Sequence, residues 1–390
     1  MDRVRVLHII TRLISGGADE NTIFNVEGLD HSRYQVDLAA GEPSEPDVVA
    51  RLQRTRFLSL PHLQRELRPG KDVLAFWEAV RLIRSHHYQL VHTHEAKAGI
   101  VGRLAARYCG VPIIVHTLHG ITFHRHLRLP VRALYLALER LAGRWTDLFI
   151  CVGEDLRQTY IANGIGEPER FVVIRSGFDL ARFHEASRQR EVHRRALRER
   201  LGLPPGTRIV GTAARLEQRK GVQFLLQAAR FLRQSHPDVH FTIAGRGPYA
   251  PRLLQLATKL GLSDRVHFLG HVHDIDAYLA ALDIFVLSSL WEGLPRAVVQ
   301  ARAVGLPVIG FEVEGIREVV RDGQNGFVVP SRDVKGLAQK IDLLLSDPEL
   351  AQNLGRYDDA THLEQWDRRR MVSEIQALYD RLVEDVQAKN

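Results

Sequence analysis

Short apolar runs alternate along the chain with longer segments in which apolar residues recur every three to four positions. The short runs have the length and the Val/Ile-rich composition of buried strands, and the longer segments have the spacing of amphipathic helices. In the first half this pattern predicts strands over residues 4–10, 34–40, 89–93, 113–118, 148–152 and 171–174, and helices over 72–87, 96–109 and 130–143. Such alternation favours an α/β fold with a parallel sheet covered on both faces.

The same alternation begins again after residue 205. Strands are predicted over 208–213, 239–244, 265–269, 283–287 and 307–310, and helices over 220–234, 249–260, 274–282, 296–304 and 365–388. Residues 183–205, between the two stretches, are charged and poor in apolar residues, and we interpret them as a linker and surface helix. The sequence therefore predicts two Rossmann-like, doubly wound domains, residues 1–182 and 206–364, which share a cleft at the carboxyl ends of their sheets.

Length and composition agree with two globular domains. A chain of 390 residues is too long for one ordinary core, and 45% hydrophobic and 25% charged positions are typical of globular proteins. The two cysteines, Cys109 and Cys151, lie among apolar neighbours, and we expect reduced, buried thiols in a cytoplasmic protein. No apolar stretch approaches the ~20 residues that span a bilayer. The basic and then apolar start, MDRVRVLHIITR, is interrupted by arginine, so we interpret it as a strand rather than a signal peptide.

The net charge is +7, and the basic excess is concentrated in the first half, in residues 50–71 and 97–144. A basic protein can bind nucleic acid, anionic membranes or phosphorylated ligands. Aromatic and aliphatic residues lie within or beside these runs: Phe57, Leu58, Phe123, Leu127 and Leu129. They suggest docking to anionic lipid or to a lipid diphosphate, on the inner face of the membrane. The alternative is an ordinary solvated basic face.

The most informative stretch is DIFVLSSLWEGLPRAVVQARAVGLPVIG, residues 283–310, which predicts a strand, a loop and a helix that begins around Pro295. Glu292 then lies in the loop at the carboxyl end of the strand. The backbone amides of Gly293 and Leu294 point out of the helix start, and Gln300 lies one to two turns into the helix. A carboxylate, free amides and a second polar group suit a sugar with its hydroxyls and a ribose diol.

Two further stretches have features of a phosphate site. In RIVGTAARLEQRKG, residues 208–221, a strand leads to Arg215 and then to Lys220 at the mouth of the next helix. Two cations at such a turn can hold a diphosphate and stabilise the charge on a leaving nucleotide. In ISGGADEN, residues 14–21, Gly16 and Gly17 allow a close backbone approach before a helix start, although a tight turn explains the pair equally well.

Histidines gather at two strand ends of the first domain, in VHTHEAK (91–97) and VHTLHGITFHRH (115–126). A zinc site is not indicated, because the sequence shows no compact ligand set with supporting residues. Of these residues we favour His119, next to Gly120, as the group that contacts a transferred sugar or its acceptor across the cleft.

Two patterns are interpreted as decoys. AGRGPYA, residues 244–250, contains the glycine spacing of a dinucleotide-binding turn, beginning at Gly245, but Pro248 changes the turn. The next strand also ends without the acidic residue that holds an adenosine ribose. Asp274 and Asp276 resemble a metal-binding Asp-x-Asp motif, but we interpret them as a helix start.

Together these segments resemble glycosyltransferase family 4, the retaining enzymes of GT-B fold, over nearly the whole chain. The matching pieces occur in the family's order: GGADEN, VHTH with TLHG, RSGFDLARF, ARLEQRKG, AGRGP, RVHFLGHV, SLWEGLPRAVVQA and VEGIREVVRDGQNGFVVP. The resemblance implies a hexosyltransferase-type enzyme with a nucleotide-sugar substrate and no metal or other cofactor. It also implies that the final helix, residues 365–390, crosses back onto the first domain.

Carried over residue by residue, the resemblance makes Arg215 and Lys220 ligands of the donor diphosphate and places Glu292, the first acid of the E-x7-E motif, on the donor sugar. His119 faces the reacting sugar.

The resemblance also implies that the loop with Gly16 and Gly17 closes on the phosphates and that the nucleotide base lies along the loop around Val272. Gly245, Gly293 and Leu294 complete the implied donor site, and His94 and Arg125 lie on the acceptor side.

Two residues depart from the family pattern. Gln300 stands where the second motif acid is expected, and a neutral amide bonds a ribose diol more weakly than a carboxylate. Pro295 replaces a frequent glycine, so one backbone donor to the sugar is missing. Because of these two departures, the nucleotide-sugar that relatives use is a weaker guide to the donor of this protein.

The predicted reaction moves a sugar from a nucleotide diphosphate to a hydroxyl of a glycan or lipid-linked acceptor, with retention, in bacterial cell-surface polysaccharide or glycolipid synthesis. No carboxylate pair is placed for double displacement, so the family's same-face attack, assisted by the departing phosphate, is expected. UDP-sugar is favoured over GDP-mannose. Three alternatives are a nucleotide-sugar epimerase of the same shape, a non-catalytic sugar-binding relative, and a nucleic-acid-binding protein, which would show salt-sensitive binding to random DNA.

Overall fold

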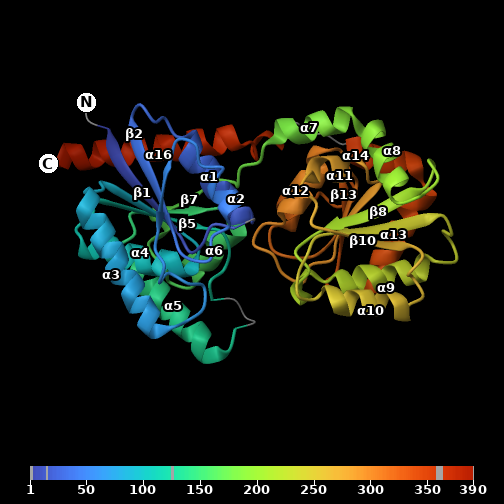
Figure 1. The fold of residues 1–390 in the computed structure, drawn as a ribbon, viewed down its shortest axis with the longest axis horizontal. Helices are drawn as coiled ribbons and strands as arrows, with labels where there is room; N and C mark the ends of the chain where they lie inside the picture. Colours follow the sequence, from blue (N-terminus) through green and yellow to red (C-terminus); the bar gives the residue numbers. More distant parts are fainter. Residues whose placement is uncertain (1–2, 15, 124–126, 357–362, 390) are drawn as a thin grey trace. The chain divides into compact units, whose positions relative to one another are not determined.

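The computed structural model describes residues 3–14, 16–123, 127–356 and 363–389, and the chain forms two compact units. The first unit contains residues 1–178 and 365–390, and the second contains residues 179–364 (Figure 1). The final helix is therefore part of the first unit, although 186 residues of the second unit precede it in the chain.

The first unit is built on a parallel sheet of seven strands in the order β3-β2-β1-β4-β5-β6-β7. Its strands are β1 (Val4–Ile10), β2 (Tyr34–Ala40), β3 (Arg56–Ser59), β4 (Leu90–His94), β5 (Ile113–Leu118), β6 (Leu148–Cys151) and β7 (Phe171–Val173). Buried apolar residues occupy consecutive positions in the central strands, because both faces of a parallel sheet are covered by helices.

Helices cover both faces of this sheet (Figure 1). They are α1 (Gly17–Gly28), α2 (Pro46–Val49), α3 (Pro69–His86), α4 (Ala96–Tyr108), α5 (Leu129–Gly143), α6 (Glu154–Ala162) and α16 (Arg368–Lys389). On one face, α1 and α16 pack together over a core that includes Val26, Met371 and Tyr379. On the other face, α3 and α4 contribute residues such as Ala79 and Ala105.

The second unit has a parallel sheet of six strands in the order β10-β9-β8-β11-β12-β13. Its strands are β8 (Arg208–Ala213), β9 (Val239–Ala244), β10 (Val266–Gly270), β11 (Ile284–Leu287), β12 (Val308–Phe311) and β13 (Gly326–Val329). Its helices are α7 (Leu180–Arg188), α8 (Arg190–Arg200), α9 (Val222–Leu232), α10 (Ala250–Lys259), α11 (Ile275–Ala280), α12 (Arg296–Ala303), α13 (Val334–Ser346) and α14 (Pro348–Arg356). One apolar core joins α9, α10 and α13 to the sheet.

The α/β class and the two Rossmann-like units agree with the sequence interpretation, and several details differ from it. Helices α13 and α14, for example, were not predicted. The strands at Arg56–Ser59 and Gly326–Val329 were not predicted. Each is an edge strand of four residues, too short to show a clear pattern. Residues 183–205, interpreted as a linker and surface helix, form most of α7 and α8, and both helices pack on α11 of the second unit.

The structure also tests the expectations for the Asp-x-Asp pattern and for the two cysteines. Asp274 is the N-cap of α11, as the interpretation of the Asp-x-Asp pattern as a helix start predicted. Both cysteines are free thiols, and Cys151 is buried, but Cys109 is only half-buried, contrary to the expectation for it. Within the described residues, no helix combines the length and apolar composition that a bilayer span requires.

Candidate functional site

The second unit has its topological switch point between β8 and β11. From β8 the chain moves outward to β9 and β10 on one side, and β11, β12 and β13 lie on the other. Because all the strands are parallel, the loops that follow β8 and β11 leave the same edge of the sheet side by side. Open α/β sheets bind ligands at such an edge. Arg215 and Lys220 follow β8, and Glu292 follows β11.

Lys220 and Glu292 form an ion pair across this switch point. The Nζ atom of Lys220 lies 2.6 Å from one carboxylate oxygen of Glu292 and 2.9 Å from the other. The side chain of Lys220 is 16% exposed and that of Glu292 is 8% exposed, so both charges are largely withdrawn from water. Withdrawing two charges from water is costly unless each compensates the other, and the contact of Lys220 with both oxygens of Glu292 supplies that compensation.

Two glycines allow the loops to approach this closely. Gly221 has φ +63°, and a Cβ atom there would lie 1.8 Å from the carbonyl oxygen of Ser288 at the end of β11. Gly245 has φ +141°, and a Cβ atom would lie 1.9 Å from the carbonyl oxygen of Ala214. The backbone amide of Leu290 donates to the carbonyl of Arg219 at 2.8 Å, which ties the β11 loop to the β8 loop.

Glu217 links the cations of the β8 loop. Its carboxylate lies 3.0 Å from the guanidinium of Arg215 and 2.8 Å from that of Arg219. Arg215 is half-exposed at 51%, and Arg219 also lies 3.9 Å from Glu292. The loop therefore presents three cations, of which the sequence interpretation named Arg215 and Lys220 and missed Arg219.

The remaining predicted donor residues lie on the same edge of the sheet or on α12. Gly293 and Leu294 follow Glu292, and Val272 follows β10 at the edge of the sheet, two strands from β8. Pro295 is the N-cap of α12, as predicted. Gln300 is half-buried on α12, and among the described residues its side chain makes no hydrogen bond to Lys220 or Glu292.

Two serines at the end of β11 were missed by the sequence interpretation. The hydroxyls of Ser288 and Ser289 are buried, and neither has a hydrogen-bond partner in the described part of the chain. Buried hydroxyls are normally paired, so such a pair beside an ion pair marks a place for an additional polar group. The signal in the sequence was the polar dipeptide that directly follows the apolar run of β11.

The first unit has its own switch point, between β1 and β4. Gly16 is the N-cap of α1 and Gly17 is its first residue, directly after β1. Asp19 in the first turn of α1 was missed as a candidate. Burial raises its pKa to about 7, although the backbone amide of Ile14 donates to its carboxylate at 3.0 Å.

Glu95, at the end of β4, is a second missed carboxylate of this switch point. It has φ +63° and ψ 171°, a backbone region that is nearly restricted to glycine. Burial also raises its pKa, and its charge contributes to the raised pKa of Asp19. The sequence signal was the acidic residue that directly follows the strand in VHTHEAK.

A chain of hydrogen bonds joins the predicted His94 and His119 to the interior. His94 Nδ1 lies 3.2 Å from His119 Nε2, and His94 Nε2 lies 3.0 Å from His8 Nδ1. His8 Nε2 lies 3.3 Å from the hydroxyl of Tyr379, on α16. Burial lowers the pKa of His94 and lowers the pKa of His8 to about 3, so both rings are neutral at physiological pH.

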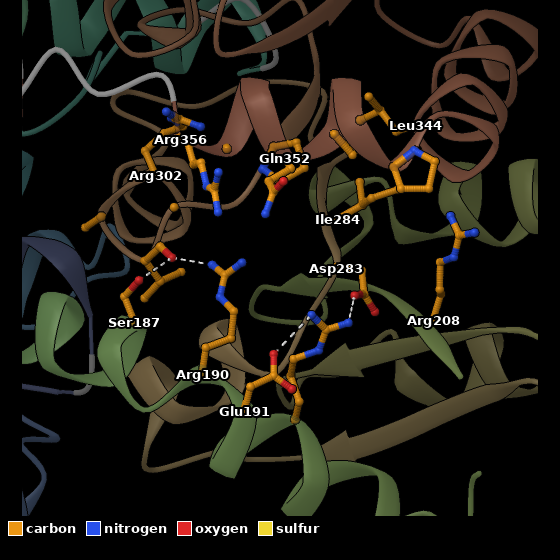
Figure 2. Close-up of a pocket in the computed structure, with 18 of the residues that line it drawn as sticks. Ser187, Arg190, Glu191, Arg208, Asp283, Ile284, Arg302, Leu344, Gln352 and Arg356 are labelled. Atoms are coloured by element: carbon orange, nitrogen blue, oxygen red, sulfur yellow. Dashed lines mark hydrogen bonds and ion pairs between the residues drawn. The ribbon is translucent and has the colours of Figure 1, made fainter. Parts of the chain in front are cut away.

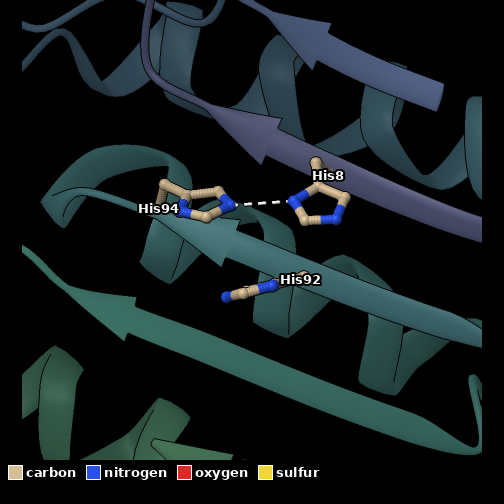
Figure 3. A group of neighbouring side chains, drawn as sticks. All are labelled: His8, His92 and His94. Carbon is tan, nitrogen blue, oxygen red and sulfur yellow. Dashed lines mark hydrogen bonds between the residues drawn. The ribbon is translucent and has the colours of Figure 1, made fainter. Parts of the chain in front are cut away.

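His8, His92 and His94 come close enough to suggest a metal site, since one nitrogen of each lies within 4.8 Å of the others (Figure 3). Their geometry instead suits hydrogen bonding. The rings of His92 and His94 are stacked, with centroids 4.3 Å apart, and lone pairs in stacked planes do not converge on one point. His92 bonds Tyr379 through Nδ1 at 2.5 Å and Thr117 through Nε2 at 2.7 Å. Arg125, the other predicted acceptor-side residue, lies outside the described residues.

Two family models match the chain, one for each half. Residues 16–182 match the model described as Glycosyltransferase Family 4, and residues 193–360 match the model described as Glycosyl transferases group 1. A curated relative, the UDP-Gal:alpha-D-GlcNAc-diphosphoundecaprenol alpha-1,3-galactosyltransferase of Escherichia coli, is 30% identical over 352 residues. That match covers 89% of each chain.

Solved structures share the fold at lower identity. HepE of Anabaena, crystallised with UDP-glucose, has a TM-score of 0.81 and 23% identity, covering 97% of this chain and 100% of its own. WaaG, a glycosyltransferase involved in lipopolysaccharide biosynthesis, has a TM-score of 0.77 and 16% identity, covering 96% and 99%. These likenesses identify the fold, with its two Rossmann-like units, as GT-B.

Proposed function

The chain belongs to glycosyltransferase family 4, and we propose that it transfers a sugar from a UDP-sugar, with retention, to a hydroxyl of a glycan or lipid-linked acceptor. It is an enzyme of the hexosyltransferase type, as its relatives are. The proposed route is the synthesis of bacterial cell-surface polysaccharide or glycolipid. An epimerase, a non-catalytic relative and a nucleic-acid-binding protein are not favoured by these relationships.

The observation that carries the proposal is the ion pair between Lys220 and Glu292 at the switch point of the second unit. A nucleotide-sugar has a diphosphate, which needs cations, next to a sugar, whose hydroxyls need acceptors. Lys220, with Arg215 and Arg219 beside it, suits the diphosphate, and Glu292 suits the hydroxyls of the sugar. The hydroxyls of Ser288 and Ser289, which have no hydrogen-bond partner among the described residues, suit further polar atoms of the donor.

In the proposed reaction the bond between the anomeric carbon and the phosphate oxygen breaks, and its electron pair stays with the phosphate. The acceptor oxygen bonds the same face of that carbon and loses its proton to the departing phosphate. Lys220 and Arg215 stabilise the negative charge that builds on the diphosphate, a role for which we propose no metal ion. His119 is the group of the first unit that we propose to act on the transferred sugar.

UDP is the favoured nucleotide because two relationships point to it. The Escherichia coli relative is named for UDP-Gal, and HepE was crystallised with UDP and with UDP-glucose. GDP-mannose is the second candidate donor. The proposed uracil position is the loop around Val272, and Gln300 is the proposed partner of the ribose diol.

The donor is tested by thermal unfolding with UDP, GDP, ADP and NAD. A ligand at about 100 times its dissociation constant adds about 2.7 kcal/mol to the free energy of unfolding. We expect UDP to stabilise the protein, and Lys220→Ala to remove the effect while Lys259→Ala, an exposed lysine of α10, retains it. Stabilisation by NAD alone, or by no nucleotide, would contradict the proposal. The anomeric configuration of the isolated product, read by NMR, tests retention.

The first unit supplies the proposed acceptor side. Exposed apolar residues project from α3 and its neighbours: Val73, Leu74 and Trp77 on α3, Tyr108 at the end of α4, and Leu129 at the start of α5. Lysines and arginines of the same region, such as Arg68 and Lys71, are also exposed or half-buried. Apolar side chains among cations are typical of surfaces that bind anionic lipid.

The basic runs are less uniform than the sequence suggested. Lys97 is buried and bonds Asp72 at 2.6 Å, and Arg103 is fully buried against Glu139 at 2.6 Å. Phe123 is also buried.

Flotation with vesicles of 30% anionic lipid tests the membrane proposal, and we expect binding that falls in the Trp77→Ser/Leu129→Ser variant. Equal flotation with neutral vesicles would contradict it.

A further inference from the structure

The second unit contains a large cavity at the edge of its sheet opposite the proposed donor site. Its volume is about 880 Å³, within the range of small-molecule sites. Its walls include Arg208, Asp283 and Pro307, at or just before the amino ends of β8, β11 and β12. The loops with Lys220 and Glu292 leave the carboxyl ends of the same strands, so the cavity is a separate place in the unit.

Arginines dominate the charged groups of the cavity (Figure 2). Among the described residues, five arginines and two carboxylates line it: Arg190, Arg194, Arg208, Arg302 and Arg356, with Glu191 and Asp283. Arg194 forms an ion pair with each of the two carboxylates. Asp283 also pairs with Arg198, at 2.9 Å. The described part of the lining therefore carries more positive than negative charge.

Arg190 is the central cation of this group. Its side chain is half-buried, and it donates to the carbonyl oxygen of Val304, which also accepts from the hydroxyl of Ser187 at 3.0 Å. Burial lowers the pKa of Arg190, and the neighbouring charge of Arg194 lowers it further. Figure 2 shows the guanidinium groups of Arg190 and Arg302 and the side chain of Gln352 pointing toward the same space.

The remaining arginines of the cavity differ in how many hydrogen bonds they make to other protein groups. Arg302 is buried and donates to three carbonyl oxygens, so it maintains the wall. Arg208 donates to the carbonyl of Leu345. Arg356 is exposed, and the structure gives it no hydrogen bond or ion pair with another described residue. Arg190 and Arg208 each make one such bond and Arg356 makes none, so among the described residues these three cations have donors available to a ligand.

We propose that this cavity binds a phosphorylated small molecule, in a site distinct from the donor site. Its phosphoryl group would accept from Arg190 and Arg356, since guanidinium groups bond phosphate oxygens with matched, charge-assisted hydrogen bonds. Leu344, Pro348 and Ala351 form an apolar part of the wall. The volume and this apolar part suit a phosphate ester that has a carbon body, rather than inorganic phosphate alone.

Calorimetry with inorganic pyrophosphate and with ribose 5-phosphate tests the site. Both are measured on Lys220→Ala, which weakens the proposed donor site, and the Arg356→Gln comparison then separates binding in the cavity from any binding that Arg215 and Arg219 still support. We expect each probe to bind at one site and to lose tenfold or more in affinity when Arg356→Gln is added, as expected for loss of a charge-assisted bond of about 1.5 kcal/mol. Arg190→Gln is expected to abolish binding.

Arg195→Gln is the matched control. Arg195 is an exposed arginine on α8, the helix of Arg190, and it does not line the cavity. When it is added to Lys220→Ala, the affinity for each probe should change by no more than about twofold, which would exclude a general effect of lost charge. Arg356→Gln changes an exposed side chain and keeps the fold, so it remains informative if Arg190→Gln unfolds the protein. Absence of binding in Lys220→Ala, or equal affinities in Arg356→Gln and Arg195→Gln, would overturn the proposal.

Discussion

His94 Nδ1 lies 3.2 Å from His119 Nε2, and the other nitrogen of His94 lies 3.0 Å from His8 Nδ1. His94 is neutral because burial lowers its pKa, and a neutral imidazole has one N–H. It therefore donates to one of these neighbours and accepts from the other. The tautomer of His119 is thereby coupled to that of a buried histidine 111 residues earlier in the chain.

This contact leads to the first prediction, which concerns catalysis. If His119 acts on the transferred sugar, His119→Ala should lower kcat by about 10²- to 10³-fold. The affinity for UDP should stay unchanged, because the residues proposed to bind the nucleotide do not include His119. Initial rates and UDP titration separate the two effects. His87→Asn, at an exposed histidine with φ +51°, is the control and should leave kcat unchanged. A kcat for His119→Ala within threefold of the wild type would exclude the proposed role.

The second prediction concerns the turn that holds Lys220. Gly221→Ala should destabilise the protein and weaken UDP binding, because the new Cβ would lie 1.8 Å from the carbonyl oxygen of Ser288. Gly323→Ala is a close control, since Gly323 has φ +74° and no atom within 4 Å of an added Cβ. That control should cost only about 1 kcal/mol, the backbone strain of alanine at positive φ. Urea unfolding of both variants measures the difference, and equal losses would show that the close approach is unimportant.

The third prediction concerns the pH dependence of stability at the glycine loop. Burial raises the pKa of Asp19 from 3.8 to about 7, so the folded protein binds a proton that the unfolded chain releases near pH 4. The stabilising effect of the neutral Asp19 on the folded state is present below about pH 4 and is lost as the pH rises toward 7. Asp19→Asn stays neutral, so its free energy of unfolding should rise by up to about 4 kcal/mol relative to that of the wild type between pH 4 and pH 7.

Urea unfolding at pH 4, 5.5 and 7 measures this difference directly. Asp155→Asn, at an exposed carboxylate in the first turn of α6, serves as the control and should show no comparable slope. If the wild type and Asp19→Asn keep a constant difference in free energy over this range, Asp19 is not titrating as the burial indicates.

The fourth prediction concerns the departure from the family motif. Gln300→Glu should lower the KM for the UDP-sugar by about three- to tenfold, because a carboxylate accepts from a ribose diol more strongly than an amide does. Arg296, four residues earlier on α12, lies on the same face of the helix and can accommodate the new charge. The kinetic constants for UDP-glucose and GDP-mannose measure the effect. An unchanged KM would remove Gln300 from the proposed ribose site.

Much of the candidate site could be predicted because parallel strands bring their carboxyl ends to one edge. Lys220 and Glu292 each follow an apolar run in the sequence, so their place at that edge required only the alternation of strands and helices. The same reasoning placed His94 and His119 after neighbouring strands. The short edge strands β3 and β13 were not predictable, since four residues contain too little pattern.

By itself, the sequence determined the class of fold, the two-unit organisation and the loops that hold the candidate groups, because these follow from local periodicity and chain order. Only the tertiary structure decided the ion pair of Lys220 with Glu292, 72 residues apart, and the raised pKa of Asp19. It also decided which arginines are buried in ion pairs and which line a cavity. Charge pairing and desolvation depend on distances between segments far apart in the chain, and no local pattern encodes those distances.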